Sequence, residues 1–465
     1  MLDWEKLLNP IRRKDLYGES EVIGTGAGRT ESERDYDRIL FATPTRRLAD
    51  KTQVFPMEQH DSIRTRLTHS HEVSNLARSI GVKIAFEHAE KVFGNRHEEL
   101  QVKRVVPAIL AAVGLAHDLG NPPFGHQGEL AMQQWFRDGG AGNSKTIHPD
   151  FLEFDGNAQT LRLVTRLQVL NDHYGLNLTL GTLAALIKYP SIYGSGNKRG
   201  YKKYGVFKSE EKIIEEIWEH TGLGPGARHP FVYIMEACDD IAYSVIDAED
   251  TVKKGYASFY DLMDHLRSVS NNDESIDDVV NKSLELNEKF KKDGLSSREL
   301  NDVSMQIFRA KAISIMIPAA TDSFVENIQR IMHGNIESGF EIIENSRCGK
   351  LCEATKKFDR RHGFQHKDVL KLELEGSNHI KRMMSVLWSA VSHEDNTSRP
   401  FERYVFGDIS ENYRRVYKSS NKESEDNAEM LTYNRCQLIC DAVSGMTESF
   451  LIKKNTEYKA LKKDE

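Results

Sequence analysis

The stretch AHDLGNPPFGHQGE, at residues 116–129, restricts the fold of this chain more than any other part of it. The apolar run Val105–Ala116 leads into it and is long enough to form a buried helix. Two glycines and two prolines follow closely, and they prevent the helix from continuing. We therefore expect a core helix that ends near His117 and Asp118, a rigid turn, and a second helix that opens with the sequence HQGE.

Helical periodicity dominates the rest of the chain as well. Apolar residues recur every three or four positions between residues 73 and 84, strand-like alternation is rare, and only 12 prolines interrupt 465 residues. The expected fold class is therefore all-α. We expect an N-terminal extension at 1–34, a core at 35–260, and a C-terminal helical region at 261–465 that packs on the core.

Four polar or glycine-rich stretches predict connections between the helices. Residues 20–30 contain G-x-G-x-G without a following Gly-Lys-Ser/Thr, which favours a flexible loop over a phosphate-binding fingerprint. The stretch 189–208 is long enough to be a lid or a substrate loop. Residues 268–278 and 418–429 are rich in serine, asparagine and acids, so we expect surface joints there, the second of them partly disordered.

Composition excludes several classes of protein. The net charge of −7 gives no overall basic field of the kind a dedicated nucleic-acid binder carries. An anionic ligand would need a local cluster of basic residues, such as Arg46, Arg47, Lys51, Arg64 and Arg66. No stretch approaches the ~20 apolar residues of a membrane span, and the N-terminus lacks the apolar segment of a secretion signal. Five cysteines form no disulfide framework. We therefore expect a cytoplasmic protein without a membrane partner.

Histidine and aspartate side chains are placed where they can form a metal site. Such a site needs three or four nitrogen or oxygen ligands from separate elements, with one position left open. Three predicted helices supply a set of this kind, made up of His69, His117, Asp118 and Asp239. Mixed imidazole and carboxylate ligands suit Mn, Fe, Co, Ni, Zn or Mg, so the identity of the metal stays open. An isolated helical histidine is more often structural, whereas His-Asp followed by GNPPFGHQGE is far more specific.

These residues lie within motifs that resemble a known family. RTRLTHS and HDLGNPPFGHQGE resemble the metal-binding motifs of HD-domain phosphohydrolases, whose ligand order is also His, His-Asp, Asp. KTQVFP, FDGNAQ, MEACDDIAYS and VSGMT narrow the resemblance to the bacterial deoxynucleoside triphosphate triphosphohydrolases, the dGTPase-like family. The motifs extend from residue 51 to 447 and so cover nearly the whole chain. The chain departs from the family at Asp155 in FDGNAQ, where glutamate is usual, and at His71, where an apolar residue is commoner.

The resemblance implies an all-α HD-domain helical metallohydrolase fold with additional C-terminal helices. It also implies one divalent metal per site, Mn or Mg by preference with Fe, Co, Ni or Zn as alternatives. The catalytic residues would be His126 and Glu129, at helical i,i+3 spacing. The ACDDIAYS motif assigns the metal ligand to Asp239, whereas Asp240 would point about 100° away around the helix, toward a salt bridge or an outer contact.

The family motifs also imply which residues meet the substrate. Arg66 would contact the triphosphate, Gln53 would bond the sugar 3′-hydroxyl, and Tyr243 would stack on the deoxyribose at C2′ and exclude ribonucleotides. The complete set of implied substrate-binding residues is Gln53, Arg66, Lys188, Tyr189, Lys203, Tyr243 and Asp247.

The implied reaction is hydrolysis of deoxynucleoside triphosphates, dGTP among them, to deoxynucleoside and inorganic tripolyphosphate. His126 would position water or protonate the 5′-oxygen, because imidazole exchanges protons near neutral pH. The expected assembly is a homo-oligomer. The alternatives are another HD-type nucleotide phosphohydrolase and a regulatory protein that binds nucleotides or single-stranded DNA. The basic cluster also leaves room for accessory binding of single-stranded DNA by an active enzyme.

Overall fold

The computed structural model describes residues 1–19, 28–57, 62–168, 172–194, 201, 203–393 and 398–462. Within these ranges the chain forms helices and connecting segments but no β-strand, and the only sheet-like pairings are three isolated β-bridges. The all-α fold class predicted from the sequence is therefore confirmed. Among the described residues, no helix has both the length and the apolar character required to cross a bilayer.

The N-terminal half of the chain contains many short helices and two long ones. They are α1 (Trp4–Leu7), α2 (Arg13–Leu16), α3 (Glu31–Leu40), α4 (Thr43–Arg47), α5 (Arg66–Glu87), α6 (Ala89–Phe93), α7 (Val102–Ala116), α8 (Gly125–Arg137), α9 (Pro149–Leu152), α10 (Gly156–Arg162), α11 (Leu180–Leu186) and α12 (Glu211–Thr221). A π-helical turn, η4 (Leu163–Leu167), continues α10.

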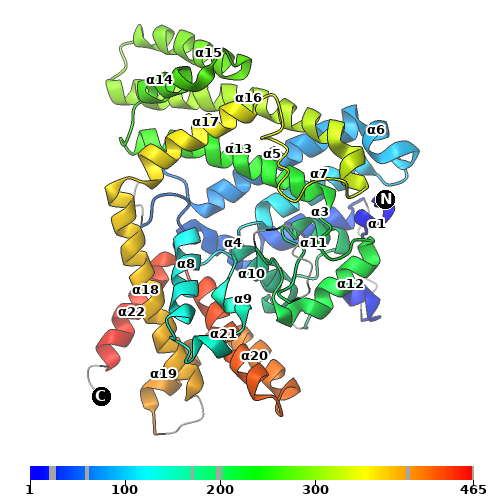
Figure 1. The fold of residues 1–465 in the computed structure, drawn as a ribbon, viewed down its shortest axis with the longest axis vertical. Helices are drawn as coiled ribbons and strands as arrows, with labels where there is room; N and C mark the ends of the chain where they lie inside the picture. Colours follow the sequence, from blue (N-terminus) through cyan, green and yellow to red (C-terminus); the bar gives the residue numbers. More distant parts are fainter. Residues whose placement is uncertain are drawn as a thin grey trace.

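The C-terminal half contains longer helices. They are α13 (Pro230–Lys253), α14 (Phe259–Ser270), α15 (Glu274–Lys291), α16 (Ser297–Met332), α17 (Gly349–Asp359), α18 (Lys367–Ser392), α19 (Pro400–Asp408), α20 (Glu411–Glu423), α21 (Ala428–Ser444) and α22 (Glu448–Lys462). A second π-helical turn, η6 (Arg360–Phe364), follows α17. Figure 1 shows an elongated molecule, with α14 and α15 at one end of the long axis and α19 and α20 toward the other.

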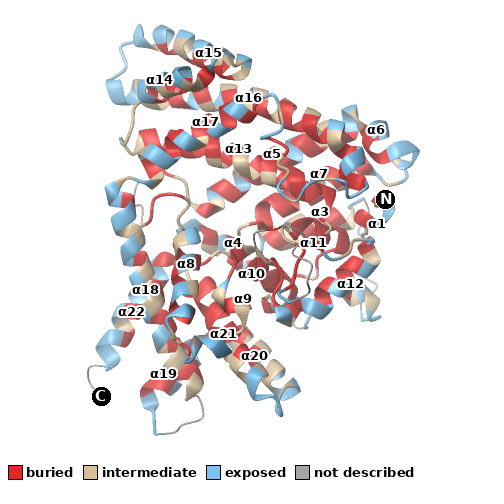
Figure 2. Cartoon of the chain, viewed as in Figure 1, coloured by how far each residue is buried: buried red, intermediate tan, exposed pale blue. Residues whose placement is uncertain are grey.

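Helices α5, α7 and α13 form the centre of the fold. α5 packs along α7, and α13 packs against both of them and against α16. In Figure 2 these central helices are largely buried, whereas α15 and α22 leave much of their surface exposed. One continuous hydrophobic core includes residues from Trp4 to Tyr458, so helices distant in sequence share it. The division of the chain at residues 34 and 260 stays a prediction.

The turn between α7 and α8 has the form expected from its glycines and prolines. α7 ends at Ala116, and α8 begins at Gly125. We call the connecting residues 118–124 the elbow. Phe124 has a φ of 63° and Gly125 a φ of 53°, two successive left-handed conformations that stop one helix direction and start another. At Gly120 the chain passes so close to α10 that a Cβ atom would lie 2.2 Å from the amide nitrogen of Thr160.

Two of the predicted connections lie partly outside the described residues, and the other two are shorter than expected. Residues 20–27 of the glycine-rich loop lie outside the described residues, as do 195–200 and 202 of the expected lid. The joint at 268–278 is reduced to a three-residue break between α14 and α15.

The expected loop at 418–429 is wrong over most of its length. α20 continues to Glu423 and α21 begins at Ala428. The polar composition of this stretch concealed an amphipathic helix, because Tyr413 and Tyr417 lie one turn apart and bury their rings against the neighbouring helices.

All five cysteines are free and buried. Burial raises the pKa of the Cys348 thiol to about 11 and that of the Cys352 thiol to about 12. Because the thiolate is the reactive form, these thiols are chemically quiet.

Candidate metal centre and active site

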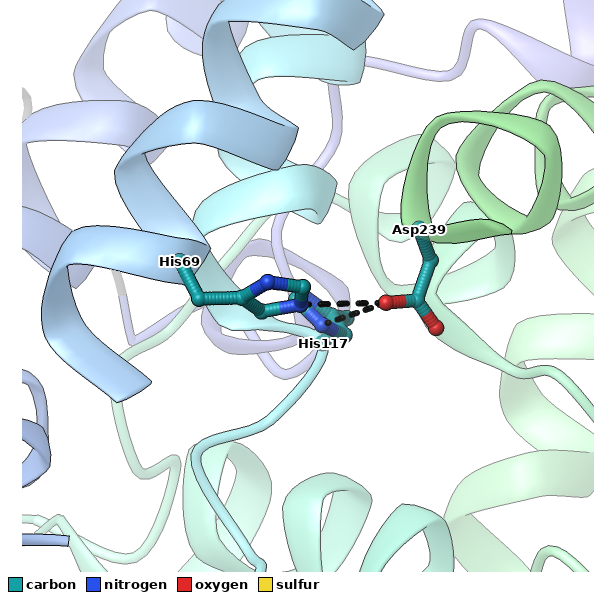
Figure 3. Close-up of side chains that lie close together, drawn as sticks. All are labelled: His69, His117 and Asp239. Atoms are coloured by element: carbon teal, nitrogen blue, oxygen red, sulfur yellow. Dashed lines mark hydrogen bonds and ion pairs between the residues drawn. The ribbon is translucent and has the colours of Figure 1, made fainter. Parts of the chain in front are cut away.

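Two histidines and one aspartate from three helices meet at the centre of the fold. Figure 3 shows His69 of α5, His117 at the end of α7 and Asp239 of α13, with contacts from both imidazoles to one carboxylate oxygen. Oδ1 of Asp239 lies 3.1 Å from Nε2 of His69 and 3.7 Å from Nε2 of His117. Each residue offers a ligand atom within 4.8 Å of the other two.

This donor set fits a divalent metal ion. An ion about 2.1 Å from each nitrogen or oxygen holds its ligand atoms roughly 3–4 Å apart, close to the spacing found here. Nδ1 of His117 lies 2.7 Å from the carbonyl oxygen of Gly114. A carbonyl only accepts hydrogen bonds, so Nδ1 carries the proton and Nε2 presents its lone pair to the cluster. That Nε2 atom is buried without a hydrogen-bond partner among the described residues, and a metal ion is a suitable partner for it.

The charges of the cluster prepare it to receive a cation. Burial opposes the charged forms of His69 and Asp239, but their mutual hydrogen bond and charge outweigh burial. The pKa of His69 is therefore raised, and the pKa of Asp239 lies well below its ordinary value. Asp239 is thus an anionic side chain in a partly buried position, and the anionic form is the one a metal ligand requires.

The fourth predicted ligand, Asp118, stands beside the cluster and has partners of its own. Its Oδ1 lies 3.5 Å from Nε2 of His117 and accepts a hydrogen bond of 2.7 Å from the side chain of Asn121. Its Oδ2 pairs with the guanidinium of Arg66. Burial opposes the charge of Asp118, but His117 and then Arg66 outweigh it and lower its pKa. Asp118 is therefore ionised within reach of the cluster, and Arg66 holds its second oxygen.

Neighbouring aspartates on α13 have different partners. Asp239 is directed at the two imidazoles, whereas Oδ1 of Asp240 lies 2.7 Å from Nζ of Lys356 on α17. Adjacent helical residues point about 100° apart, so the two carboxylates serve different sides of α13. In this arrangement Asp240 joins two helices, and Asp239 faces the two histidines of the candidate metal centre.

A histidine–glutamate pair follows the elbow on the first turn of α8. Nδ1 of His126 lies 3.0 Å from Oε2 of Glu129. The imidazole is exposed, at 67% of its side-chain surface, whereas Glu129 is buried. Oε1 of Glu129 accepts the backbone N–H of Gly156 at 2.7 Å, and Nζ of Lys203 lies 3.6 Å from Oε2 and 2.5 Å from Asp155. The glutamate is therefore fixed on several sides, while the histidine ring faces open space.

The FDGNAQ segment supports the candidate site from outside, a role that the family resemblance did not assign to it. Asp155 caps α10 and binds Lys203, and the N–H of Gly156 orients Glu129. Asn121, in the elbow, orients Asp118. These supporting residues were missed as site residues, although the motif and the GNPP sequence contained them.

We expect the substitution Gly156→Ala to disturb this arrangement. A Cβ atom at position 156 would lie 2.0 Å from Oδ1 of Asn121, so Asn121 must turn away and release Asp118. Overpacking of this kind costs about 1–3 kcal/mol, and thermal unfolding should show a lower Tm. Gly224→Ala is the control, because a Cβ atom there meets nothing within 4 Å. Equal Tm values for the two variants would contradict the close packing at Gly156.

Tyr243 and Asp247 lie one and two turns beyond Asp239 on α13. The ring of Tyr243 stacks on Phe364 of η6, with centroids 5.3 Å apart and planes inclined by 21°. Asp247 is fully buried, and neither carboxylate oxygen has a hydrogen-bond partner among the described residues. Oε1 of Gln53 is also buried without a partner there. Unpaired acceptors of this kind are suited to receive the hydroxyl groups of a ligand.

Lys188 and Tyr189 form part of a charged group next to the start of α13. Nζ of Lys188 lies 3.7 Å from Glu236, and Nη1 of Arg228 binds the same carboxylate at 2.8 Å. The guanidinium of Arg228 lies over the ring of Tyr189, 5.6 Å from its centroid. Burial opposes the charge of Lys188, but Glu236 outweighs it and raises the pKa of Lys188. Lys188 is therefore a cation beside Glu236, which lies one turn before Asp239 on α13.

A second buried carboxylate lies near Asp247, and it offers a test of the electrostatics. Asp359 at the end of α17 is fully buried, and its oxygens have no hydrogen-bond partner among the described residues. Burial and then the charge of Asp247 raise its pKa well above the ordinary value. The folded protein therefore holds this proton at pH values where the unfolded chain has lost it, and stability falls as the pH rises through that window.

We expect Asp359→Asn to raise the Tm at pH 8 and to change it little at pH 4. The substitution removes the proton uptake that folding requires at pH 8, which costs about 1.4 kcal/mol for each unit by which burial raises the pKa. The measurement is a pair of thermal melts at the two pH values, in EDTA. Asp278→Asn, which removes an exposed partner of Lys282, is the control and should shift neither melt much. A lower Tm for Asp359→Asn at pH 8 would contradict the unpaired state of Asp359.

Most of the basic residues between positions 46 and 66 are engaged in structural contacts. Arg64 pairs with three carboxylates, and Arg47 donates to a hydroxyl and a carbonyl of the C-terminal region. Lys51 donates to two backbone carbonyls. Arg66 is the member of this group that pairs with a residue of the candidate metal centre. The density of basic residues in the sequence therefore overstates the cations free to meet an anion.

An all-helical core that gathers His, His-Asp and Asp from three helices, beside a His–Glu pair, defines an HD-domain hydrolase. The family model for the HD domain matches residues 66–153, a range that contains α5, the elbow and α8. The chain belongs to the family of deoxyguanosinetriphosphate triphosphohydrolase-like proteins, which confirms the resemblance seen in the sequence motifs.

Relatives match nearly the full length of the chain. A deoxyguanosinetriphosphate triphosphohydrolase-like protein of Listeria monocytogenes is 34% identical over 97% of both chains. A protein of the same description from Pseudomonas aeruginosa is 30% identical, again over 97% of both. The deoxyguanosinetriphosphate triphosphohydrolase of Salmonella schwarzengrund is 31% identical over 90% of this chain and 91% of its own.

Proposed function

We propose that this protein hydrolyses deoxynucleoside triphosphates, dGTP among them, to deoxynucleoside and inorganic tripolyphosphate. The observation that carries the proposal is the cluster of His69, His117 and Asp239 together with the His126–Glu129 pair, which the elbow connects to His117 and Asp118. The names of the relatives supply the substrate class. The chemistry requires water oxygen to form a bond to the α-phosphorus while the bond from phosphorus to the 5′-oxygen breaks.

In this proposal one divalent ion, Mn²⁺ or Mg²⁺ by preference, would be held by His69, His117, Asp118 and Asp239. Bound there, the ion supplies Lewis-acid stabilisation of negative charge on the α-phosphate. One guanidinium nitrogen of Arg66 pairs with Asp118, and its other N–H groups can donate to the triphosphate. Lys188 and Lys203 add positive charge on two other sides of the site.

His126 carries out proton transfer in the proposed mechanism. The departing 5′-oxygen needs a proton, and the exposed imidazole can deliver one or orient the attacking water. Glu129 holds Nδ1 of this ring, so Nε2 is the nitrogen that faces the reacting groups. Fixation of Glu129 by Gly156 and Lys203 keeps the imidazole in one orientation.

The proposed nucleoside subsite uses the unpaired groups on α13 and near α5. Tyr243 provides an aromatic face for the deoxyribose, and its position against C2′ would exclude a 2′-hydroxyl. Gln53 and Asp247 supply buried acceptors without partners of their own, and the sugar 3′-hydroxyl can donate to them. Tyr189 is the remaining residue of the proposed substrate-binding set.

A product assay tests the proposal. Purified protein with Mn²⁺ or Mg²⁺ is incubated with each dNTP and with GTP, singly and in mixtures, and the products are separated by ion-pair chromatography. We expect deoxynucleoside and tripolyphosphate from dNTPs and no turnover of GTP. A monophosphate product would assign the protein to another class of HD phosphohydrolase. Absence of turnover in all mixtures would favour a regulatory nucleotide-binding protein.

A separate groove favours accessory binding of single-stranded DNA as a second candidate function. It lies between α3, α5 and α7, encloses about 910 Å³, and combines basic side chains and aromatic rings with two acids, Glu33 and Asp37, which pair with Arg104 and Arg29. The relevant residues are Arg29, Arg78, Lys103, Arg104, Tyr36 and Phe86. Bases can stack on such rings while the cations follow the phosphates. Salt-dependent binding of a dT oligonucleotide that survives His117→Ala but weakens in Arg78→Ala would support this role, and equal affinity of both variants would oppose it.

We also propose a homo-oligomer in the cytoplasm. Phe41 and Leu374 expose 74% and 64% of their surfaces, so a subunit interface over either of them would bury apolar area. The free thiols and a nucleotide substrate fit the reducing cytoplasm. Light scattering on the purified protein measures the assembly directly.

A further inference from the structure

Two sequence motifs far apart in the chain meet at the elbow. KTQVFP begins at Lys51, and VSGMT ends one residue before Glu448, the first residue of α22. Neither Lys51 nor Glu448 belongs to the metal cluster or to the His126–Glu129 pair. Both are nonetheless buried, at 3% and 4% exposure. Burial of a lysine or a glutamate destabilises the fold unless its hydrogen bonds are satisfied. The contacts of these two side chains therefore indicate which parts of the structure they hold together.

The Glu448 carboxylate binds the elbow to the segment that follows α4. Its Oε1 accepts the backbone N–H of Phe124 at 3.0 Å and the backbone N–H of Thr52 at 2.7 Å. Its Oε2 accepts the Thr52 hydroxyl at 2.5 Å and the N–H of Met57 at 3.3 Å. Phe124 is the left-handed residue that starts α8, so the strained point of the elbow is the point that Glu448 holds.

Lys51 holds the other side of the same turn. Its Nζ donates to the carbonyl oxygen of Asn121 at 2.6 Å and to that of Ser444, the last residue of α21, at 2.7 Å. The backbone carbonyl of Lys51 also accepts the N–H of Arg66 at 3.0 Å, which ties this segment to the first turn of α5. The side chains of Lys51 and Glu448 thereby join the elbow to the α21–α22 junction, and the backbone of Lys51 connects them to α5.

The elbow separates the two halves of the candidate site. Asp118 stands at its beginning, beside the metal cluster, and His126 stands just beyond its end. The relative position of these two groups depends on the path of the backbone between them. We propose that Glu448 and Lys51 are positioning residues that fix this path, so that the α21–α22 junction completes a site whose other named residues lie between positions 53 and 247. This inference rests on the proposed function for its catalytic readout only.

The first arm of the test uses amide hydrogen exchange and does not need catalysis. In Glu448→Ala the N–H of Phe124 loses its acceptor, and we expect exchange in the peptide that contains the elbow to become about 10-fold faster. Peptides from α13 should exchange as in the unchanged protein. Ser449→Ala is the matched control, because Ser449 bonds only Asp50 at the surface among the described residues. Unchanged exchange at the elbow in Glu448→Ala would overturn the proposal.

The second arm measures dNTP hydrolysis. We expect Glu448→Ala to lower kcat about 100-fold while KM stays within about threefold, because displacement of a catalytic group by 1 Å has an effect of that size. Glu448→Gln keeps an oxygen for the backbone N–H groups of Phe124 and Thr52, so it should recover most of kcat. It also replaces the alanine variant in this test if that variant folds poorly. Lys51→Met should lower kcat in the same way. A fall in kcat that merely matches the unfolded fraction would overturn the proposal, whereas lack of activity in the unchanged protein would overturn the proposed function and leave the exchange test intact.

Discussion

Asp239→Asn is expected to lower the rate of dNTP hydrolysis by about 10³-fold or more, since a metal ion contributes several kcal/mol to the transition state. Asp239 is the residue whose single oxygen lies near both imidazoles, at 3.1 and 3.7 Å, so the amide removes the charge that balances a divalent ion. Mn²⁺ affinity, measured by calorimetry, should fall together with the rate. Treatment of the unchanged protein with EDTA should abolish activity, and Mn²⁺ should restore it.

Asp240→Asn is the matched control for this experiment. The two residues are adjacent on one helix and equal in charge, but Asp240 pairs with Lys356 on α17. The control variant should lose some stability and keep its metal affinity and most of its activity. If the two variants reversed, with Asp240→Asn losing metal and Asp239→Asn retaining it, the assignment of the ligand on α13 would be wrong.

His126→Ala is expected to lower kcat by about 10²–10⁴-fold, the usual contribution of a general acid or base. Because the exposed imidazole makes no contact with the metal cluster among the described residues, metal affinity should be unchanged. Glu129→Gln should give a smaller loss, since the amide oxygen can still receive one of the hydrogen bonds that hold the pair. The measurements are single-turnover rates and Mn²⁺ titrations on the same preparations.

Gln127→Ala controls for disturbance of the first turn of α8. It lies next to His126 but makes no side-chain hydrogen bond in the described structure. Activity equal to that of the unchanged protein is the expected result for Gln127→Ala. Full activity in His126→Ala would remove this histidine from the mechanism and direct attention to Lys203 as the remaining proton carrier near Glu129.

The sequence was sufficient to predict the elbow and the helices around it. Proline and glycine restrict the backbone wherever they occur, so the stop after Ala116 and the restart near Gly125 follow from local chemistry. The buried helix before the elbow was predictable in the same way, because its apolar residues must pack against other apolar residues. The loop expected at 418–429 failed for the opposite reason, because tertiary packing of Tyr413 and Tyr417 outweighs a polar composition.

Partners of charged residues could not be predicted from the sequence. Arg64 and Arg66 are two residues apart, and both looked available to an anion. The structure gives Arg64 three carboxylates, including Glu249 and Asp250, and leaves Arg66 beside Asp118. Two of the carboxylates that pair with Arg64 lie almost 200 positions away in the sequence, and no local sequence pattern indicates such a contact. The contact between Glu448 and Phe124 is hidden in the same way.

The buried state of all five cysteines has a practical consequence for experiments on this protein. Maleimide reagents attack thiolates at the surface, and here the native thiols are both covered and kept protonated. A cysteine introduced at an exposed position, for example by Lys371→Cys on α18, would be the preferred target of a fluorophore or spin label. Spectroscopic distances across the molecule could then be recorded on a chain that keeps every native cysteine.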